Sequence, residues 1–100
     1  MKNIGLGLIG FGTIGTGVVR LLQESGDLLA ERLGARLVLR RIADIDIASP
    51  RPVSIDRSLL TTDARQVLQD PSIEIVMELM GGYEPARTFL LEAIARKKHL

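Results

Sequence analysis

Hydrophobic positions along the chain form two patterns, short continuous blocks and stripes with helical spacing. The blocks cover residues 4–9, 35–43 and 73–80 and are rich in Ile, Val and Leu. Continuous apolar blocks of this length are typical of strands buried on both faces of a parallel sheet. Helical spacing covers about residues 13–25 and 84–97. The alternation predicts an α/β fold, a Rossmann-like, doubly wound parallel sheet.

The first helix is expected to break near its end. Ser25-Gly26-Asp27 interrupts the pattern, because glycine disfavours a helix interior and Asp27 can cap a new turn. A short helical piece over 28–33 then ends at Gly34. One long, locally strained helix is the competing interpretation.

The middle of the chain predicts a loop followed by two short elements. Two prolines within residues 47–56 remove backbone donors and favour a loop there. A short strand is expected over 58–62, and a short helix capped by Thr62 or Asp63 is expected to run through Leu68.

Three glycines follow the first block with the spacing G-x-G-x-x-G, at Gly10, Gly12 and Gly15. Gly10 permits a tight turn, Gly12 removes a side chain where a pyrophosphate approaches the backbone, and Gly15 lets helix and strand pack closely. Thr13 adds a hydroxyl at the helix start, whose free N–H groups favour phosphate. Strand, turn and helix together predict a dinucleotide-binding site, and a glycine-rich turn without a ligand is the alternative.

Acidic residues follow the second block. Asp44 stands where such folds use a carboxylate to accept hydrogen bonds from the adenosine ribose and to repel a 2′-phosphate. Its distance from the glycines exceeds the usual ~20 residues, and the extra helical piece accounts for the difference. Asp46 is a second candidate, and an ordinary loop aspartate is the alternative. Arg40 and Arg41 argue in the other direction, since a nearby arginine can receive a 2′-phosphate.

A further carboxylate, Glu78, lies at the carboxyl end of the third block. An unpaired carboxylate there is costly, so Glu78 is expected to have a partner, either a cationic group of the fold or a polar group in the site. Gly81 and Gly82 follow, and they either let the backbone pass close to a nicotinamide or form a tight turn. His99 begins what looks like another strand.

Composition narrows the classes of function. The 100 residues suffice for one domain, and a net charge of +1 gives no indication of a nucleic-acid surface. No apolar run approaches the roughly 20 residues of a membrane span, and residues 1–3 lead directly into a strand, leaving no room for a signal peptide. A cytoplasmic location is therefore expected. Cysteine is absent, no metal-ligand spacing is present, and no residue is assigned a catalytic role.

With these residues in view, the chain resembles the amino-terminal part of the homoserine dehydrogenase family. The resemblance covers the whole chain. The matching stretches are Gly-Leu-Ile-Gly-Phe-Gly-Thr-Ile-Gly-Thr-Gly-Val-Val at 7–19, Pro-Arg-Pro-Val at 50–53, Leu-Leu-Thr-Thr-Asp at 59–63, and Glu-Leu-Met-Gly-Gly with Glu-Pro-Ala-Arg at 78–87. The first stretch is shared with many dehydrogenases, and its combination with the last is more specific.

The resemblance implies an enzyme that interconverts L-homoserine and L-aspartate 4-semialdehyde by hydride transfer with NAD(P), in threonine and methionine biosynthesis. It implies that residues 1–100 are an incomplete NAD(P)-binding domain, cut in its fifth strand, with the dimerisation and catalytic domains absent. The full-length protein is expected to be a homo-oligomer, and this chain alone is expected to be inactive. The alternatives are another NAD(P)-dependent oxidoreductase of a small carbonyl compound and a non-catalytic NAD(H)-sensing module.

The resemblance also implies roles for individual residues. Many relatives carry Arg after the second strand, where this chain has Ile45 between two aspartates, and this difference favours NAD over NADP. Two groups of residues are expected to contact the cofactor. Those at the pyrophosphate are Gly10, Phe11, Gly12, Thr13, Ile14 and Gly15, and those along the nicotinamide are Met80, Gly81 and Gly82.

Overall fold

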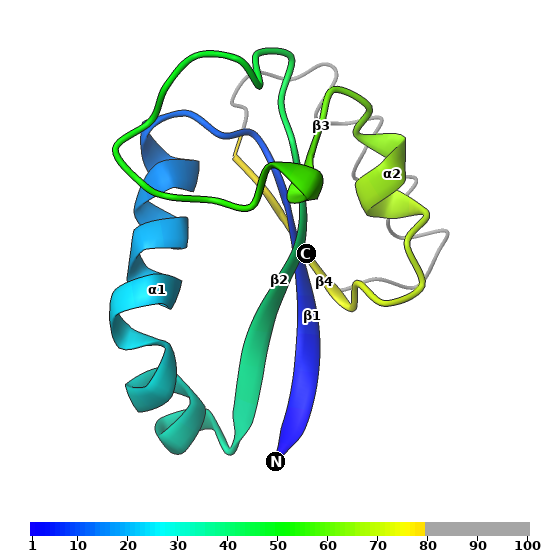
Figure 1. The fold of residues 1–100 in the computed structure, drawn as a ribbon. Coiled ribbons are helices and arrows are strands. Elements are labelled where there is room, and N and C mark those ends of the chain that lie inside the picture. The colour runs from blue at the N-terminus through cyan, green and yellow to red at the C-terminus, as the bar shows by residue number, and fades with distance from the viewer. Residues whose placement is uncertain (80–100) are drawn as a thin grey trace.

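The computed structural model of the protein describes residues 1–79 as one parallel sheet with a helix on each face (Figure 1). The strand order is β3-β2-β1-β4. In chain order the elements are β1 (Lys2–Ile9), α1 (Thr13–Leu33), β2 (Ala35–Ala43), the 3-10 helix η1 (Arg57–Leu59), β3 (Leu60–Thr61), α2 (Arg65–Leu68) and β4 (Ile75–Glu78). The predicted fold class is confirmed, and the strand expected from His99 lies outside the described residues.

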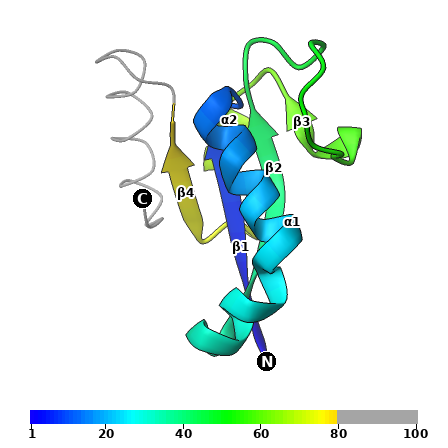
Figure 2. The same cartoon turned by 90° about the vertical axis from the view of Figure 1, so that its left-hand side faces the viewer.

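Strand β1 is one of the two inner strands, and it pairs with β2 along its whole length and with β4 over its carboxyl half (Figure 2). Leu6 pairs with Leu39, whereas Gly7 pairs with Arg41, so the register skips Arg40. All three pairings are parallel. The carboxyl ends of the strands therefore meet at one edge, where ligands bind in folds of this class.

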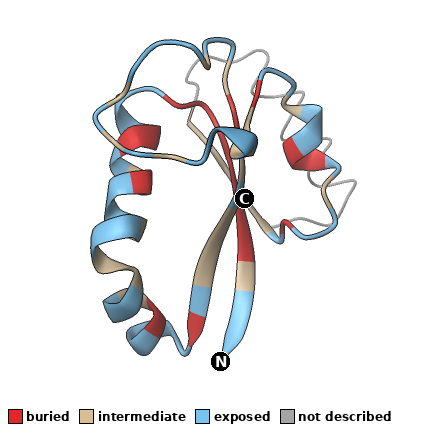
Figure 3. Cartoon of the chain, viewed as in Figure 1, coloured by how far each residue is buried: buried red, intermediate tan, exposed pale blue. Residues whose placement is uncertain are grey.

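Two apolar clusters lie on opposite faces of the sheet, because successive strand residues point to opposite sides. Figure 3 shows that buried residues concentrate along the strands and on the sides of the helices that face them. The cluster under α1 consists of Leu6, Leu8, Phe11, Val19 and Ile42. The cluster under α2 consists of Ile9, Ala43, Val67, Leu68, Ile73 and Val76.

The break predicted in the first helix is confirmed. Ser25 has φ −125° and ψ 16° inside α1, so the helix is kinked there rather than continuous. The helix ends at Gly34, whose φ is +71° and whose N–H donates to the Ala30 carbonyl at 2.9 Å. A left-handed residue of this kind is a common helix stop and favours glycine.

Three of the predicted elements are shorter than expected. The strand expected over 58–62 shrinks to β3, because Asp56 accepts a hydrogen bond from Ser58 N and starts η1. The short helix is α2, whose N-cap is Ala64 and not the expected Thr62 or Asp63, although Asp63 accepts from Arg65 N at 2.9 Å just before it. The strand expected over 73–80 is β4 within the described residues, which end before Met80.

Candidate dinucleotide-binding site

The glycine turn leaves the carboxyl end of β1 between its two neighbouring strands. Gly10 N donates to the Ala43 carbonyl of β2 at 2.7 Å, and Leu79 N after β4 donates to the Ile9 carbonyl at 2.8 Å. Gly10 has φ +110°, a conformation that residues with side chains rarely adopt. The tight turn expected at Gly10 is therefore present.

The other two glycines of the motif have different surroundings. A Cβ at Gly15 would lie 2.5 Å from the Gly10 carbonyl oxygen, so the start of α1 packs directly on the turn. A Cβ at Gly12 would meet no heavy atom within 4 Å. Of these two glycines, Gly12 is the one with open space over it.

The start of α1 carries no side-chain cap. Gly12 occupies the N-cap position without a side-chain hydrogen bond, and no acidic residue lies in the first turn. The first N–H groups of a helix lack acceptors within the helix and favour an anion. They border a cavity of about 370 Å³ between α1 and the loop after β2. The lining residues are Phe11, Gly12, Thr13, Thr16, Gly17, Arg20, Ser49, Arg51 and Pro52.

Asp44, the predicted ribose acceptor, lies directly after β2 and bonds to the protein's own backbone. Its Oδ2 accepts from Phe11 N at 2.7 Å, and its Oδ1 accepts from Asp46 N at 2.8 Å. Its side chain is 19% exposed. The ribose contact stays a prediction, and each carboxylate oxygen already has one donor.

Arg51 makes the most contacts among the lining residues to which the sequence analysis gave no role. Its Nε donates to the Phe11 carbonyl at 2.9 Å, its Nη1 to the Ser49 carbonyl at 2.9 Å, and its Nη2 to the Asp46 carbonyl. The guanidinium lies 4.5 Å from the centroid of the Phe11 ring. Residues 50–53 are one of the stretches that carry the family resemblance, and this was the available signal.

The loop after β2 is also attached to α1, over whose amino-terminal half it passes in Figure 1. Arg20 Nη2 donates to the Pro52 carbonyl at 3.0 Å, and Gln23 Nε2 donates to the Ser54 carbonyl. Within the loop, hydrogen bonds from the Ser49 hydroxyl, Ser49 N–H and Ala48 N–H lower the pKa of Asp46. The bonds from Arg20 and Gln23 hold the loop against α1.

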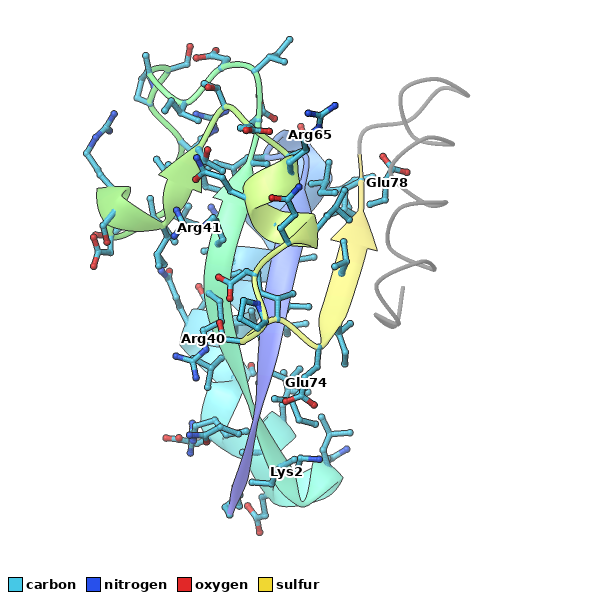
Figure 4. The ribbon with its side chains drawn as sticks, turned by 90° about the vertical axis from the view of Figure 1, so that its right-hand side faces the viewer. Lys2, Arg40, Arg41, Arg65, Glu74 and Glu78 are labelled. Carbon is cyan, nitrogen blue, oxygen red and sulfur yellow. The ribbon has the colours of Figure 1, made fainter. Side chains whose placement is uncertain are left out.

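The two arginines considered for a 2′-phosphate lie elsewhere. Arg41 Nη1 donates to Gln66 Oε1 at 3.3 Å, beside α2 on the opposite face of the sheet from α1 (Figure 4). Arg40 is exposed, and neither residue lines the cavity at Gly12.

Glu78 is the last residue of β4, and its backbone stands opposite Ile9 of β1 in the strand register. Met80, Gly81 and Gly82 lie outside the described residues.

Residues 1–79 contain neither a candidate metal site nor a candidate membrane span. No group of three or more His, Cys, Asp or Glu side chains is placed to hold a metal ion. No helix in this part of the chain combines the length and apolar character that crossing a membrane requires.

The sheet order and the glycine turn after β1 define the first half of a dinucleotide-binding domain of the Rossmann class. Residues 10–100 match the family model described as homoserine dehydrogenase, NAD binding domain. The chain belongs to this family.

Individual relatives agree with the family match. The chain is 35% identical over 100 residues to the homoserine dehydrogenase of Bacillus subtilis, covering 100% of this chain and 23% of that protein. It is 43% identical over 95 residues to that of Corynebacterium glutamicum, covering 95% and 21%. The crystal structure of S. aureus homoserine dehydrogenase at pH 8.5 superposes with a TM-score of 0.90 at 36% identity, covering 99% of this chain and 25% of that one. The chain thus spans about a quarter of these proteins.

Proposed function

We propose that the chain is the cofactor-binding part of a homoserine dehydrogenase, the enzyme that interconverts L-homoserine and L-aspartate 4-semialdehyde. A nicotinamide dinucleotide bound here takes up or gives up the hydride. The observation that carries the proposal is the open space over Gly12 at the uncapped start of α1, in a chain of this family.

The residues present fit the pyrophosphate of such a cofactor. Backbone N–H groups at the start of α1 and the hydroxyls of Thr13 and Thr16 border the cavity, and Arg20 and Arg51 add positive charge to its wall. A phosphate at a helix start is favoured by about 0.3–1 kcal/mol when exposed and up to about 2 kcal/mol when partly buried. The chain therefore binds and orients the diphosphate.

The proposal extends to a preference for NAD over NADP. Asp44 and Asp46 place two carboxylates after β2, and the Ser49 and Ala48 hydrogen bonds that lower the pKa of Asp46 keep it ionised. A 2′-phosphate near them is repelled. Arg51, whose Nη2 lies 3.8 Å from Asp44 Oδ1, already donates to three backbone carbonyls.

The remaining parts of the reaction belong to the longer protein in this proposal. Dimerisation, substrate binding and proton transfer lie outside residues 1–100, and the full-length enzyme is a homo-oligomer that acts in the cytoplasm in threonine and methionine biosynthesis. The 100-residue chain by itself leaves homoserine oxidation at background.

Parallel calorimetric titrations with NADH and NADPH test this function. We expect weak binding of both, with NADH the tighter ligand, and no homoserine oxidation by the pure chain. Tighter binding of NADPH would refute the preference for NAD. Arg20, which lines the cavity, would then be the candidate for contacting the 2′-phosphate. Binding of neither ligand would refute the cofactor site. Homoserine oxidation by the chain alone would refute the proposal that substrate binding and proton transfer lie outside residues 1–100.

A further inference from the structure

The residue between the first two glycines of the motif has both of its backbone polar groups bound by distant side chains. Phe11 N donates to Asp44 Oδ2 at 2.7 Å, and the Phe11 carbonyl accepts from Arg51 Nε at 2.9 Å. The Phe11 side chain is 1% exposed and packs under the Arg51 guanidinium. These contacts come from positions 33 and 40 residues further along the chain.

The two hydrogen bonds fix two successive peptide groups. Phe11 N belongs to the peptide that joins it to Gly10, and the Phe11 carbonyl belongs to the peptide that joins it to Gly12. A trans peptide is planar, so its N–H points opposite to its carbonyl. By binding the Phe11 carbonyl, Arg51 thus determines the direction of the Gly12 N–H.

The same two side chains form an opposite-charge pair with little exposure. Asp44 Oδ1 lies 3.8 Å from Arg51 Nη2, and the side chains are 19% and 14% exposed. Asp44 Oδ1 also accepts from Asp46 N, and Arg51 donates to the Ser49 and Asp46 carbonyls. Hydrogen bonds with a charged partner are stronger than neutral ones. The pair therefore holds the turn with bonds of the stronger kind.

We propose that Asp44 and Arg51 are positioning residues of the pyrophosphate site, which set the peptide groups on both sides of Phe11. Asp44 then acts on the cofactor through the Phe11 peptide, and not by accepting hydrogen bonds from the adenosine ribose. This inference rests on the proposed cofactor-binding function.

Two ligands separate the two roles of Asp44. ADP carries a diphosphate and a complete ribose, whereas 2′-deoxy-ADP lacks the 2′-hydroxyl. We titrate both into the chain and into Arg51→Met, Arg51→Lys and Asp44→Asn. Arg36→Met is the matched control, because it removes one arginine and a surface ion pair with Asp27 at the far end of β2.

A positioning role predicts that both ligands weaken together. Arg51→Met should lose about tenfold in affinity for ADP and for 2′-deoxy-ADP, which corresponds to 1.4 kcal/mol. Arg51→Lys should restore part of this loss, Asp44→Asn should weaken both ligands by one common factor, and Arg36→Met should change neither. A preference of the unsubstituted chain for ADP that disappears in Asp44→Asn would overturn the inference in favour of a ribose contact.

Amide NMR of the ligand-free chain supplies an independent readout. Arg51→Met should shift the Gly12 amide signal and speed hydrogen exchange at the Phe11 amide, and Arg36→Met should leave both unchanged. Unchanged amides together with unchanged ADP affinity in Arg51→Met overturn the positioning role while NADH binding, and with it the proposed function, stands. If the unsubstituted chain binds neither NADH nor ADP, the proposed function fails, and the amide signals alone decide whether the pair sets the turn. Arg51→Lys and Asp44→Asn nearly keep the side-chain volume. If Arg51→Met does not fold, the same titrations and amide measurements are made on these two variants.

Discussion

The same glycine spacing occurs twice in succession, first from β1 to the turn after it and then from that turn into α1. Gly5, Gly7 and Gly10 have the spacing G-x-G-x-x-G, and so do Gly10, Gly12 and Gly15. A Cβ at Gly5 would lie 1.8 Å from the Ser72 carbonyl oxygen, whereas a Cβ at Gly12 would meet nothing within 4 Å. Gly5 and Gly7 make room for the protein's own chain, as Gly15 does, whereas the space over Gly12 is the one proposed for the ligand.

The strand glycines let α2 and the segment after it approach the sheet. A Cβ at Gly7 would lie 2.6 Å from Val67 Cγ1 and 3.0 Å from Ile73 Cδ1, both in the cluster under α2. Glu74 N also donates to the Gly5 carbonyl at 2.9 Å. Spacing alone does not separate a packing glycine from a binding glycine, because the difference lies in what surrounds the missing Cβ.

The largest effect is expected from Gly5→Ala. The new methyl group would overlap a backbone carbonyl, which cannot rotate away as a side chain can. Overpacking of a buried site costs about 1–3 kcal/mol and occasionally more, and we expect about 3 kcal/mol or more here. Urea unfolding followed by circular dichroism measures it. A loss below 1 kcal/mol would show that the segment at Ser72 shifts easily, and the contrast with Gly12 would then weaken.

Gly15→Ala is expected to reduce both stability and binding. Its Cβ would lie 2.5 Å from the Gly10 carbonyl oxygen, so either the helix start or the turn must move. Overpacking costs about 1–3 kcal/mol, and the roughly 1 kcal/mol helix preference of Ala over Gly offsets part of it, which leaves up to about 2 kcal/mol of destabilisation. Denaturant unfolding and NADH titration of the same sample measure the two losses. A stable variant with unchanged NADH affinity would contradict the close packing of helix and turn.

Gly12→Ala should separate binding from stability. The added methyl group enters open space, so the free energy of unfolding should fall by no more than about 1 kcal/mol, the cost of replacing an N-cap glycine by the less favoured alanine. NADH affinity should fall about tenfold or more, because the methyl group occupies the space expected for the pyrophosphate.

Gly26→Ala is the matched control for Gly12→Ala. It adds a methyl group to α1 near Arg36 Nη1, at 4.0 Å and away from the turn, and should not change NADH affinity. Equal affinities of Gly12→Ala and Gly26→Ala would refute the ligand space over Gly12.

The elements that the sequence predicted best are those set by neighbouring residues. The strand expected over 35–43 has the same bounds in the structure, because its apolar block is closed by Gly34 on one side and Asp44 on the other. The kink at Ser25 lies beside Gly26, a residue that disfavours a helix interior. Local chain chemistry is sufficient for such features.

The partners within the site could not be predicted in this way. Asp44 was placed correctly at the end of β2, but its bond to Phe11 depends on how the turn folds back beside it. Arg51 contacts Phe11 across 40 residues of sequence. An arginine in a loop belongs to no periodic pattern from which such a contact could be predicted. The same holds for Arg41, whose partner Gln66 is known only once α2 is placed.

The smallest effect is expected from acidification, which should affect the turn at Phe11 before the strand at Gly7. Hydrogen bonds from Ser49 and Ala48 lower the pKa of Asp46, and the same loop presents the Ser49 and Asp46 carbonyls to Arg51. Because the folded pKa lies below the unfolded value near 3.9, this contribution is present above about pH 4 and is lost as the pH falls through the folded pKa. Hydrogen exchange as a function of pH, corrected for intrinsic rates, should therefore show loss of protection at Phe11 before Gly7. In Asp46→Asn the protection at Phe11 should already be reduced at neutral pH and should lose this acid step. Equal acid responses at the two amides would mean that the strand and the turn open as one unit. The two glycine sets would then differ only in the space around their missing Cβ atoms.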